Sequence, residues 1–252
     1  MDIVFLSAEG WKVEKGEVDT VSLLVNGHVM VDTGWHAVHN LLREDVPVEQ
    51  VDTLLLTHLH QDHRMGLPAM LFYLFNAFQN AGGLTICGVD GVEDIVRMAL
   101  EYAGHERDYP HAPAPDVLTL SAGMQLETDG LRIETAASHH AVPGLMYRFT
   151  DDAGHIVVYT GDTAPSEETI AFARGADVLI HEHSWGAVRP EDNANACGHS
   201  SAQDAARIAK AAGAGALWLV HAAPHQEEEA LKCARAIFPN TFRAHAGERI
   251  QL

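Results

Sequence analysis

Four apolar stretches of this chain run directly into histidine or aspartate, and this pattern constrains the fold and the function more than any other feature. They are LLLTHLHQDH from position 54, VVYTGD from 157, VLIHEH from 178 and LWLVH from 217. Apolar runs of this length predict buried β-strands. Open α/β sheets gather their binding sites at strand ends. We therefore expect the function of this chain to lie along one sheet edge.

Strand-like and helix-like segments alternate in both halves of the chain, which predicts layered sheets with helices on their outer faces. In the first half, strands are expected at DIVFL, VSLLV, HVMVDTG, VDTLLLTH and LTICG, with helices at HAVHNLLRE, LPAMLFYLFNAF and GVEDIVRMALEYAG. In the second half, strands are expected at GLRIETAAS, LMYRFT, HIVVYTGD, DVLIHE and ALWLVH, with helices at SEETIAFARG and SAQDAARIAKAAG. No polar linker divides the halves, so we expect one α/β domain over residues 1–252.

The charge balance argues against binding of nucleic acid by the bare surface. The chain has 35 acidic and 16 basic residues and a formal net charge of -19, which repels polyanions. Its three cysteines are far apart and have no CxxC spacing, so we expect reduced thiols. The apolar run at the N-terminus is too short for a signal peptide, and no stretch reaches the ~20 apolar residues of a membrane span. We expect a cytoplasmic protein without a membrane partner.

The densest cluster of chemically active side chains is the string His58, His60, Asp62 and His63. In an extended segment, residues two apart share a face, so His58 and His60 can point to one metal ion while Leu59 turns into the core. A sharp turn into the following helix would direct Asp62 and His63 to a second position. Imidazole and carboxylate ligands of this kind suit zinc. A polar turn is the alternative, but four candidate ligands in six residues favour a metal site.

With these motifs the sequence resembles the metallo-β-lactamase superfamily, and within it the ribonuclease Z-like branch. The resemblance covers nearly the whole chain, because later motifs follow in order: HAVPGLMYRF from 140, YTGDT from 159, LIHE from 179, GHSSAQDAARIA from 198 and LWLVH from 217, besides VDTG at 31–34. The resemblance implies a four-layer αββα sandwich and a dinuclear centre of two divalent metal ions, zinc first, with manganese or iron as alternatives. It implies a homodimer as well.

Carried over residue by residue, the resemblance assigns seven ligands. It gives one ion to His58, His60 and His140, the other to Asp62, His63 and His221, and makes Asp162 the bridge. Carboxylates can bridge because they have two oxygens, whereas a neutral imidazole offers one lone pair.

Several of these positions have competing interpretations. His139 competes with His140, and the His-x-x-Pro pattern ending at Pro143 favours His140. Asp162 could instead be an aspartate at the turn before a helix. His221 could be a core histidine, and His225 is its nearby competitor. For His181 and His183, of which one could be buried and the other exposed, we predict no role.

The resemblance also implies the catalytic roles. Two ions about 3.5 to 4 Å apart would hold a bridging water or hydroxide as the nucleophile, and Asp62 would orient it and take its proton. Glu182 holds the imidazole of His199, which helps to protonate the departing oxygen. Ser200 or Ser201, with Asp204, already caps the helix that follows His199, so His199 is not required there.

The chain departs from ribonuclease Z in one informative place. Ribonuclease Z has a long arm for tRNA between the motifs of His140 and Asp162, and here only 22 positions separate them. The glycine-rich loop that usually opens such enzymes is replaced by SAEGWKVEKGEVDT. We therefore expect a small phosphoester substrate. The alternatives are a lactone, carboxylic ester or sulfate ester, tRNA 3′ processing, or a metal-stabilised binding protein without turnover.

Overall fold

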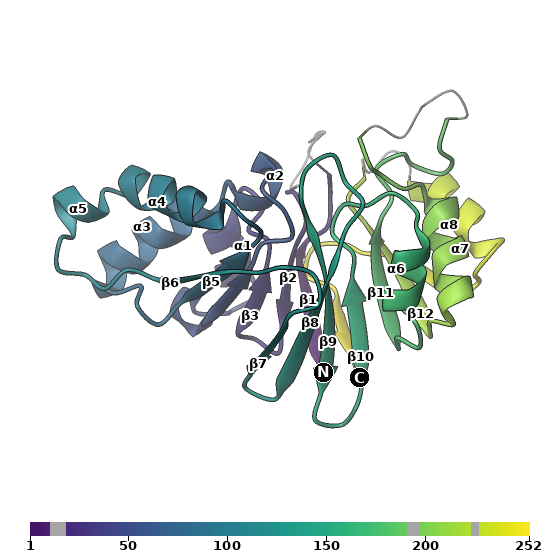
Figure 1. Ribbon diagram of the computed structural model, residues 1–252, viewed down its shortest axis with the longest axis horizontal. Coiled ribbons are helices and arrows are strands. Elements are labelled where there is room, and N and C mark those ends of the chain that lie inside the picture. Colours follow the sequence, from purple (N-terminus) through teal and green to yellow (C-terminus); the bar gives the residue numbers. More distant parts are fainter. Residues whose placement is uncertain (11–18, 191–196, 223–226) are drawn as a thin grey trace. The chain divides into compact units, whose positions relative to one another are not determined.

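The chain forms two seven-stranded mixed sheets (Figure 1). The computed structural model describes residues 1–10, 19–190, 197–222 and 227–252. Its contacts divide them into two units. Unit 1 comprises residues 1–7, 19–120 and 246–252, and unit 2 comprises the other described residues. Each unit is built around its own sheet, and no strand is shared between the two sheets.

The sheet of unit 1 has the strand order β14-β1-β2-β3-β4-β5-β6. Its strands are β1 (Asp2–Ser7), β2 (Ser22–Val25), β3 (Val29–Val31), β4 (Thr53–Leu55), β5 (Thr85–Gly88), β6 (Asp116–Thr119) and β14 (Arg249–Gln251). The strands from β3 to β6 are parallel, and the other pairs are antiparallel. Parallel neighbours end at the same edge, which brings the segments after β3 and β4 together.

The helices of unit 1 connect the parallel strands. They are α1 (Ala37–Arg43), the 3-10 helix η1 (Val48–Gln50), α2 (Gln61–Arg64), α3 (Leu67–Phe78), α4 (Val92–Tyr102) and α5 (His105–Asp108). Met70 and Phe75 of α3 and Val96 of α4 share one buried cluster with Leu54 and Ile86 of the sheet. The helix predicted at 67–78 is present as α3 and buries one face only, because its Phe72 and Phe78 are exposed.

The sheet of unit 2 has the order β13-β12-β11-β10-β9-β8-β7. Its strands are β7 (Gln125–Thr128), β8 (Leu131–Ala137), β9 (Leu145–Asp151), β10 (Ile156–Tyr159), β11 (Val178–Glu182), β12 (Ala216–Val220) and β13 (Thr241–Arg243). β7 to β10 form an antiparallel meander, and β10 to β13 are parallel. The segments that follow β10, β11 and β12 therefore leave the sheet at one edge.

Three helices complete unit 2: α6 (Glu167–Phe172), α7 (Ala202–Ala212) and α8 (Glu227–Arg235). Alanine-rich α7 packs closely on the sheet, and its Ala205 and Ile208 share a buried cluster with Val158, Leu179 and Leu217 of the parallel strands. Ser201 caps α7 through a capping box with Asp204, as predicted. Figure 1 shows α6, α7 and α8 beside β11 and β12.

The predicted strands and long helices are all present, and the missed elements are short or marginal. The strands β6, β7, β13 and β14 have three or four residues each. Helix α8 begins with three glutamates, so its sequence has only a weak pattern of apolar residues. None of the three cysteines is in a disulfide, and burial raises the pKa of the Cys87 thiol to about 11. Within the described part of the chain, no helix is long and apolar enough to cross a membrane.

Candidate metal centre

The histidines that follow β4 lie at the edge of the unit 1 sheet and face each other. His58 is buried, and its Nε2 lies 3.1 Å from Nδ1 of His60. Leu59, between them, packs against the hydrophobic core, as strand alternation predicts. Two nitrogen ligands on a tetrahedral zinc ion, each at about 2.05 Å, lie roughly 3.3 Å apart. The separation of these two ring nitrogens is therefore suitable for two ligands of one ion.

A buried aspartate orients His63. Asp32 follows β3, is fully buried, and accepts a hydrogen bond from Nδ1 of His63 at 2.8 Å. It also accepts bonds from the backbone N–H and the hydroxyl of Thr57, both at 2.8 Å. A carboxylate cannot donate, so Nδ1 of His63 carries the proton and Nε2 carries the lone pair. Metal-binding histidines are commonly held in this way by a carboxylate.

Asp62 is positioned through its backbone. The Thr20 hydroxyl donates to the Asp62 carbonyl at 2.6 Å, and Oδ2 of Asp62 lies 3.8 Å from Nε2 of His63. Both side chains come from the four-residue helix α2, which begins directly after His60. The sharp turn predicted after His60 is confirmed. It gives a carboxylate oxygen and an imidazole nitrogen a common direction within unit 1.

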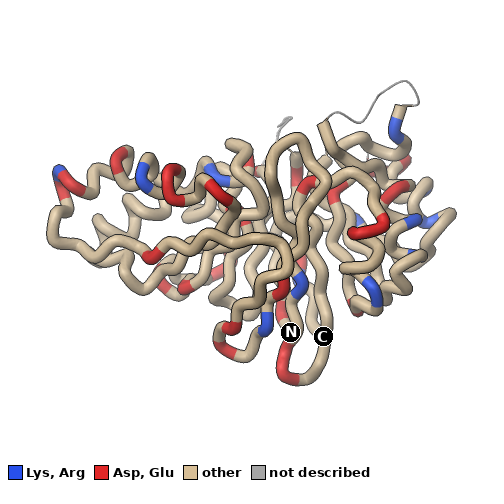
Figure 2. Tube along the Cα trace, in the orientation of Figure 1, with Lys and Arg blue, Asp and Glu red and all other residues tan. Residues whose placement is uncertain are grey.

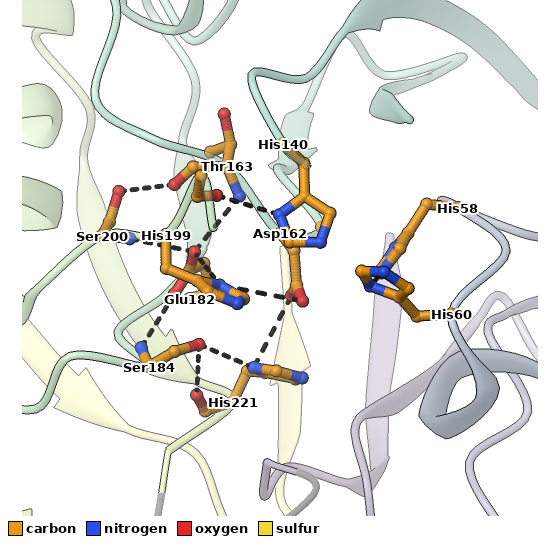
Figure 3. Close-up of polar contacts among 12 residues, drawn as sticks. His58, His60, His140, Asp162, Thr163, Glu182, Ser184, His199, Ser200 and His221 are labelled. Atoms are coloured by element: carbon orange, nitrogen blue, oxygen red, sulfur yellow. Dashed lines mark hydrogen bonds and ion pairs between the residues drawn. The ribbon is translucent and has the colours of Figure 1, made fainter. Parts of the chain in front are cut away.

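Asp162 lies at the corresponding edge of unit 2, after β10. Its side chain is buried, and the preceding Gly161 adopts a left-handed φ of 54°, which turns the chain tightly. The alternative that Asp162 caps the next helix is wrong, because Ser166 caps α6. Oδ1 of Asp162 lies 3.6 Å from Nδ1 of His221, and Oδ2 lies 3.9 Å from Nδ1 of His199 (Figure 3).

The structure distinguishes His140 from His139. Nδ1 of His140 donates to the Gly198 carbonyl at 3.0 Å, which places the lone pair on Nε2. Burial lowers the pKa of His140, so the neutral imidazole that a metal requires is favoured. His139 points elsewhere, with its Nε2 3.3 Å from the exposed carboxylate of Glu168. Gly198 is required at this contact, because a Cβ there would lie 2.5 Å from Cα of His140.

Glu182, at the end of β11, joins three loops. Its buried carboxylate accepts from the backbone N–H of Thr163, Ser184 and Ser200, at 3.2, 2.8 and 3.0 Å. The fourth bond comes from Nδ1 of His199 at 3.0 Å. The predicted pairing of Glu182 with His199 is therefore present (Figure 3).

The Glu182–His199 pair lies beside two of the predicted ligands. Potential ligand atoms of His140, Asp162 and His199 all lie within 4.8 Å of one another. The imidazole of His199, which Glu182 orients, thus lies next to the candidate bridging carboxylate of Asp162.

The two histidines that flank Glu182 are both fully buried, which corrects the expectation that one is exposed. His181 donates through Nδ1 to the Glu182 carbonyl, and His183 to the Val220 carbonyl. Burial lowers the pKa of both, that of His183 strongly. A lowered pKa favours the neutral form of both imidazoles. His225, the competitor of His221, and most of the N-terminal loop lie outside the described residues.

A family model for the beta-lactamase superfamily domain matches residues 28–222, which is most of the chain. The chain belongs to this superfamily. Ribonuclease BN of an Enterobacter strain is 28% identical over an alignment that covers 95% of this chain and 96% of the relative. Ribonuclease Z of Brevibacillus brevis is 26% identical, with 84% and 83% covered. With these relatives, the chain falls in the ribonuclease Z-like branch of the metallo-β-lactamase superfamily and is a metal-dependent hydrolase.

Solved structures confirm the predicted metallo-β-lactamase fold along the whole chain. The protein YhfI of Bacillus subtilis has a TM-score of 0.82 and 24% identity, with 99% of this chain and 98% of that chain covered. The short form of human tRNase Z has a TM-score of 0.78 at 21% identity, with 100% and 99% covered. A diphosphatase of the PhnP family has 0.73 at 17% identity, with 99% and 96% covered. Identities this low establish the fold alone.

Two residues that orient the candidate ligands were missed in the sequence. Asp32 stands in the VDTG motif at the end of an apolar strand, so the strand-end rule could have identified it. Ser184 follows VLIHEH, and its hydroxyl lies 2.8 Å from Nδ1 of His221. No local pattern marks it, because its partner is 37 positions away.

Proposed function

We propose that this metal-dependent hydrolase is a phosphodiesterase that uses two divalent ions, zinc first among them, to cleave a small phosphoester. The observation that carries the proposal is the Glu182–His199 pair. A fully buried carboxylate accepts from Nδ1 of His199 and stabilises the cationic imidazolium form. An imidazolium suits the charge of a phosphoryl transition state and the proton demand of its leaving oxygen. Hydrolysis of a β-lactam or thioester has no comparable need for it.

The proposed ligand sets are His58, His60 and His140 for one ion, Asp62, His63 and His221 for the other, and Asp162 for both. The fit rests on donor chemistry. Hydrogen-bond acceptors hold Nδ1 of His63 and of His140, which places the lone pair of each on Nε2. Two bound ions would polarise phosphoryl oxygens and lower the pKa of water towards neutrality.

The chain's own groups then perform the proton transfers. Asp62 accepts the proton of the attacking water. The hydroxyl of Thr20 holds Asp62 in place by donating to its backbone carbonyl. His199 delivers a proton to the departing oxygen, and Glu182 keeps its ring oriented. Groups that are oriented in this way before the reaction lose little free energy to reorganisation during it.

A small substrate is favoured by the interval between His140 and Asp162. β9 and β10 occupy most of it and are joined by a turn at residues 152–155, so no arm emerges there. The alignment with Enterobacter ribonuclease BN spans 298 positions, more than the 252 residues of this chain, so that relative contains segments that this chain lacks. Lys and Arg are scattered among more numerous Asp and Glu along the described residues (Figure 2).

The direct test is turnover of bis(p-nitrophenyl) phosphate by the zinc-loaded protein. We expect hydrolysis by the wild type, and a loss of about 10²- to 10⁴-fold in His199→Ala. His60→Ala should lack activity because an ion is lost. Wild-type turnover no higher than that of His60→Ala would count against the proposal. Lactone hydrolysis that survives His199→Ala would favour a lactonase instead.

Transfer RNA processing is the second candidate, because curated relatives along most of the chain are named ribonuclease Z or ribonuclease BN. A precursor tRNA with a 3′ extension distinguishes the two. The phosphodiesterase proposal predicts cleavage of the small diester and no specific 3′ cleavage of the precursor. Efficient cleavage at the tRNA 3′ junction would identify tRNA, and not a small phosphoester, as the substrate.

A further inference from the structure

One serine hydroxyl at the end of β11 contacts both the ring and the backbone of a candidate metal ligand. Oγ of Ser184 lies 2.8 Å from Nδ1 of His221 and 3.1 Å from the carbonyl oxygen of the same residue (Figure 3). The sheet register explains the approach. β11 and β12 are parallel neighbours with Glu182 opposite Val220, so Ser184 and His221 follow paired strand ends.

The two contacts share a single hydroxyl proton, and this determines which ring nitrogen of His221 is protonated. The Ser184 hydroxyl has one proton, and the carbonyl oxygen can only accept. If the hydroxyl donates to the carbonyl, its lone pair accepts the proton of Nδ1 and both contacts are hydrogen bonds. If it donated to Nδ1 instead, the carbonyl contact would lack a proton. The first arrangement satisfies both contacts and leaves the lone pair of the imidazole on Nε2. The nearest Asp162 oxygen, at 3.6 Å, is too far to replace the hydroxyl.

The backbone of His221 gives the same hydroxyl a second task. His221 has a left-handed φ of 60°, which is uncommon for a residue other than glycine. Its N–H donates to the Ala8 carbonyl at 2.7 Å, and its carbonyl accepts from Ser184. Ser184 is fixed in turn, because its N–H donates to Glu182 at 2.8 Å. The hydroxyl therefore holds the ring and the backbone of His221 relative to the carboxylate that orients His199.

We propose that Ser184 is the positioning residue of His221: its hydroxyl fixes the Nδ1–H tautomer, so that Nε2 is the metal-binding atom. This inference rests on the proposed function for the role of His221 as a ligand. Partners of this kind raise metal affinity, and their loss commonly costs 10- to 100-fold.

The test compares Ser184→Ala with Ser184→Thr, which keeps the hydroxyl. Nitrogen-15 NMR of the imidazoles in the metal-free protein, assigned with a His221→Gln variant, reports which ring nitrogen carries the proton. We expect Nδ1–H in the wild type and in Ser184→Thr, and a mixture of tautomers in Ser184→Ala. Titration with zinc against a chelating dye should show at least 10-fold weaker binding of one ion in Ser184→Ala only. Ser200→Ala is the matched control, because it removes a buried hydroxyl that donates to the Thr163 carbonyl and to no imidazole.

The outcomes separate the two claims. An Nε2–H tautomer in the wild type, or a ring unchanged by Ser184→Ala, would overturn the role of Ser184. If Ser184→Ala alters the tautomer but zinc leaves the His221 signals unchanged in the wild type, His221 is not a ligand and the proposed ligand set fails. Equal effects of Ser184→Ala and Ser200→Ala would reduce Ser184 to a general packing contribution and would also overturn the proposal.

Discussion

Replacement of Asp32 by asparagine tests how the fold orients a metal ligand. Asp32 accepts three hydrogen bonds at 2.8 Å, from Thr57 N–H at Oδ1 and from the Thr57 hydroxyl and His63 Nδ1 at Oδ2. Asparagine keeps the volume and tolerates the left-handed φ of 55° at this position. The substitution therefore changes the hydrogen-bonding pattern with little change of shape.

Each orientation of the new amide disrupts one of the interactions that Asp32 makes. With its NH₂ at the former Oδ2, it donates to Nδ1 of His63, which moves the ring proton to Nε2 and removes the lone pair that would bind metal. With its NH₂ at the former Oδ1, it opposes the Thr57 N–H, and two buried donors face each other at a cost of about 1 to 3 kcal/mol. We expect the first orientation. One ion should then bind 10- to 100-fold more weakly, which is equivalent to about 1.4 to 2.7 kcal/mol of binding free energy.

The assay is competition for zinc with a chelating dye, accompanied by urea unfolding of the metal-free protein. Asp52→Asn is the matched control, since Asp52 also pairs with an imidazole in unit 1, with Oδ2 3.0 Å from Nδ1 of His28, and no candidate ligand is involved. The control should bind both ions normally. If Asp32→Asn binds both ions as tightly as the wild type, the proposed orientation of His63 is refuted.

Three further changes have expected outcomes. Gly198→Ala should lower the free energy of unfolding in urea by at least about 1 kcal/mol more than Gly213→Ala. Both glycines have a left-handed φ, but only at Gly198 would a Cβ clash, with the backbone of His140. Equal losses of unfolding free energy in the two variants would contradict this. Burial lowers the pKa of His183. As pH falls below about 6.5, the unfolded chain therefore binds a proton at this residue that the folded chain does not. The folded state loses up to about 1.4 kcal/mol of stability at pH 5.5 for this reason. His183→Gln should lose less stability between pH 7.5 and 5.5 in the metal-free protein, and an unchanged loss would exclude this explanation. The resemblance implies a homodimer, so light scattering should show a dimer. Phe72→Lys, on the exposed face of α3, should convert it to a monomer. A monomeric wild type would contradict this expectation.

The candidate ligands that could be predicted either have local spacing or stand at the ends of apolar runs. His58 and His60 alternate along one extended segment, and Asp62 and His63 follow at a turn, so their common direction is determined by backbone geometry. Asp162 and His221 could be predicted because each ends an apolar run, and parallel strands end at a common sheet edge. The same rule made Glu182 a candidate, and its contact with His199 is present in the structure.

The contacts that orient these candidate ligands could not be predicted in the same way, although the strand-end rule could have marked Asp32 itself. Asp32 contacts His63 across 31 positions, and Ser184 contacts His221 across 37, so each contact depends on sheet register. That both His181 and His183 are buried was not predicted, and His183 shows the reason. It is polar and follows the strand β11, yet it is fully buried and its Nδ1 donates to the Val220 carbonyl of the neighbouring strand. Short strands such as β13 and β14 were missed because three residues give too weak a periodic pattern.

The central claim is that the proposed ligands hold two ions that act on a phosphodiester. Metal content and bis(p-nitrophenyl) phosphate turnover, measured on the same samples of wild type, His60→Ala and Asp162→Asn, test it most directly. We predict two zinc equivalents and turnover in the wild type, and fewer equivalents without turnover in both variants. A wild type that binds two equivalents but hydrolyses the diester no faster than His60→Ala, or an Asp162→Asn variant that keeps both ions and full activity, would contradict it.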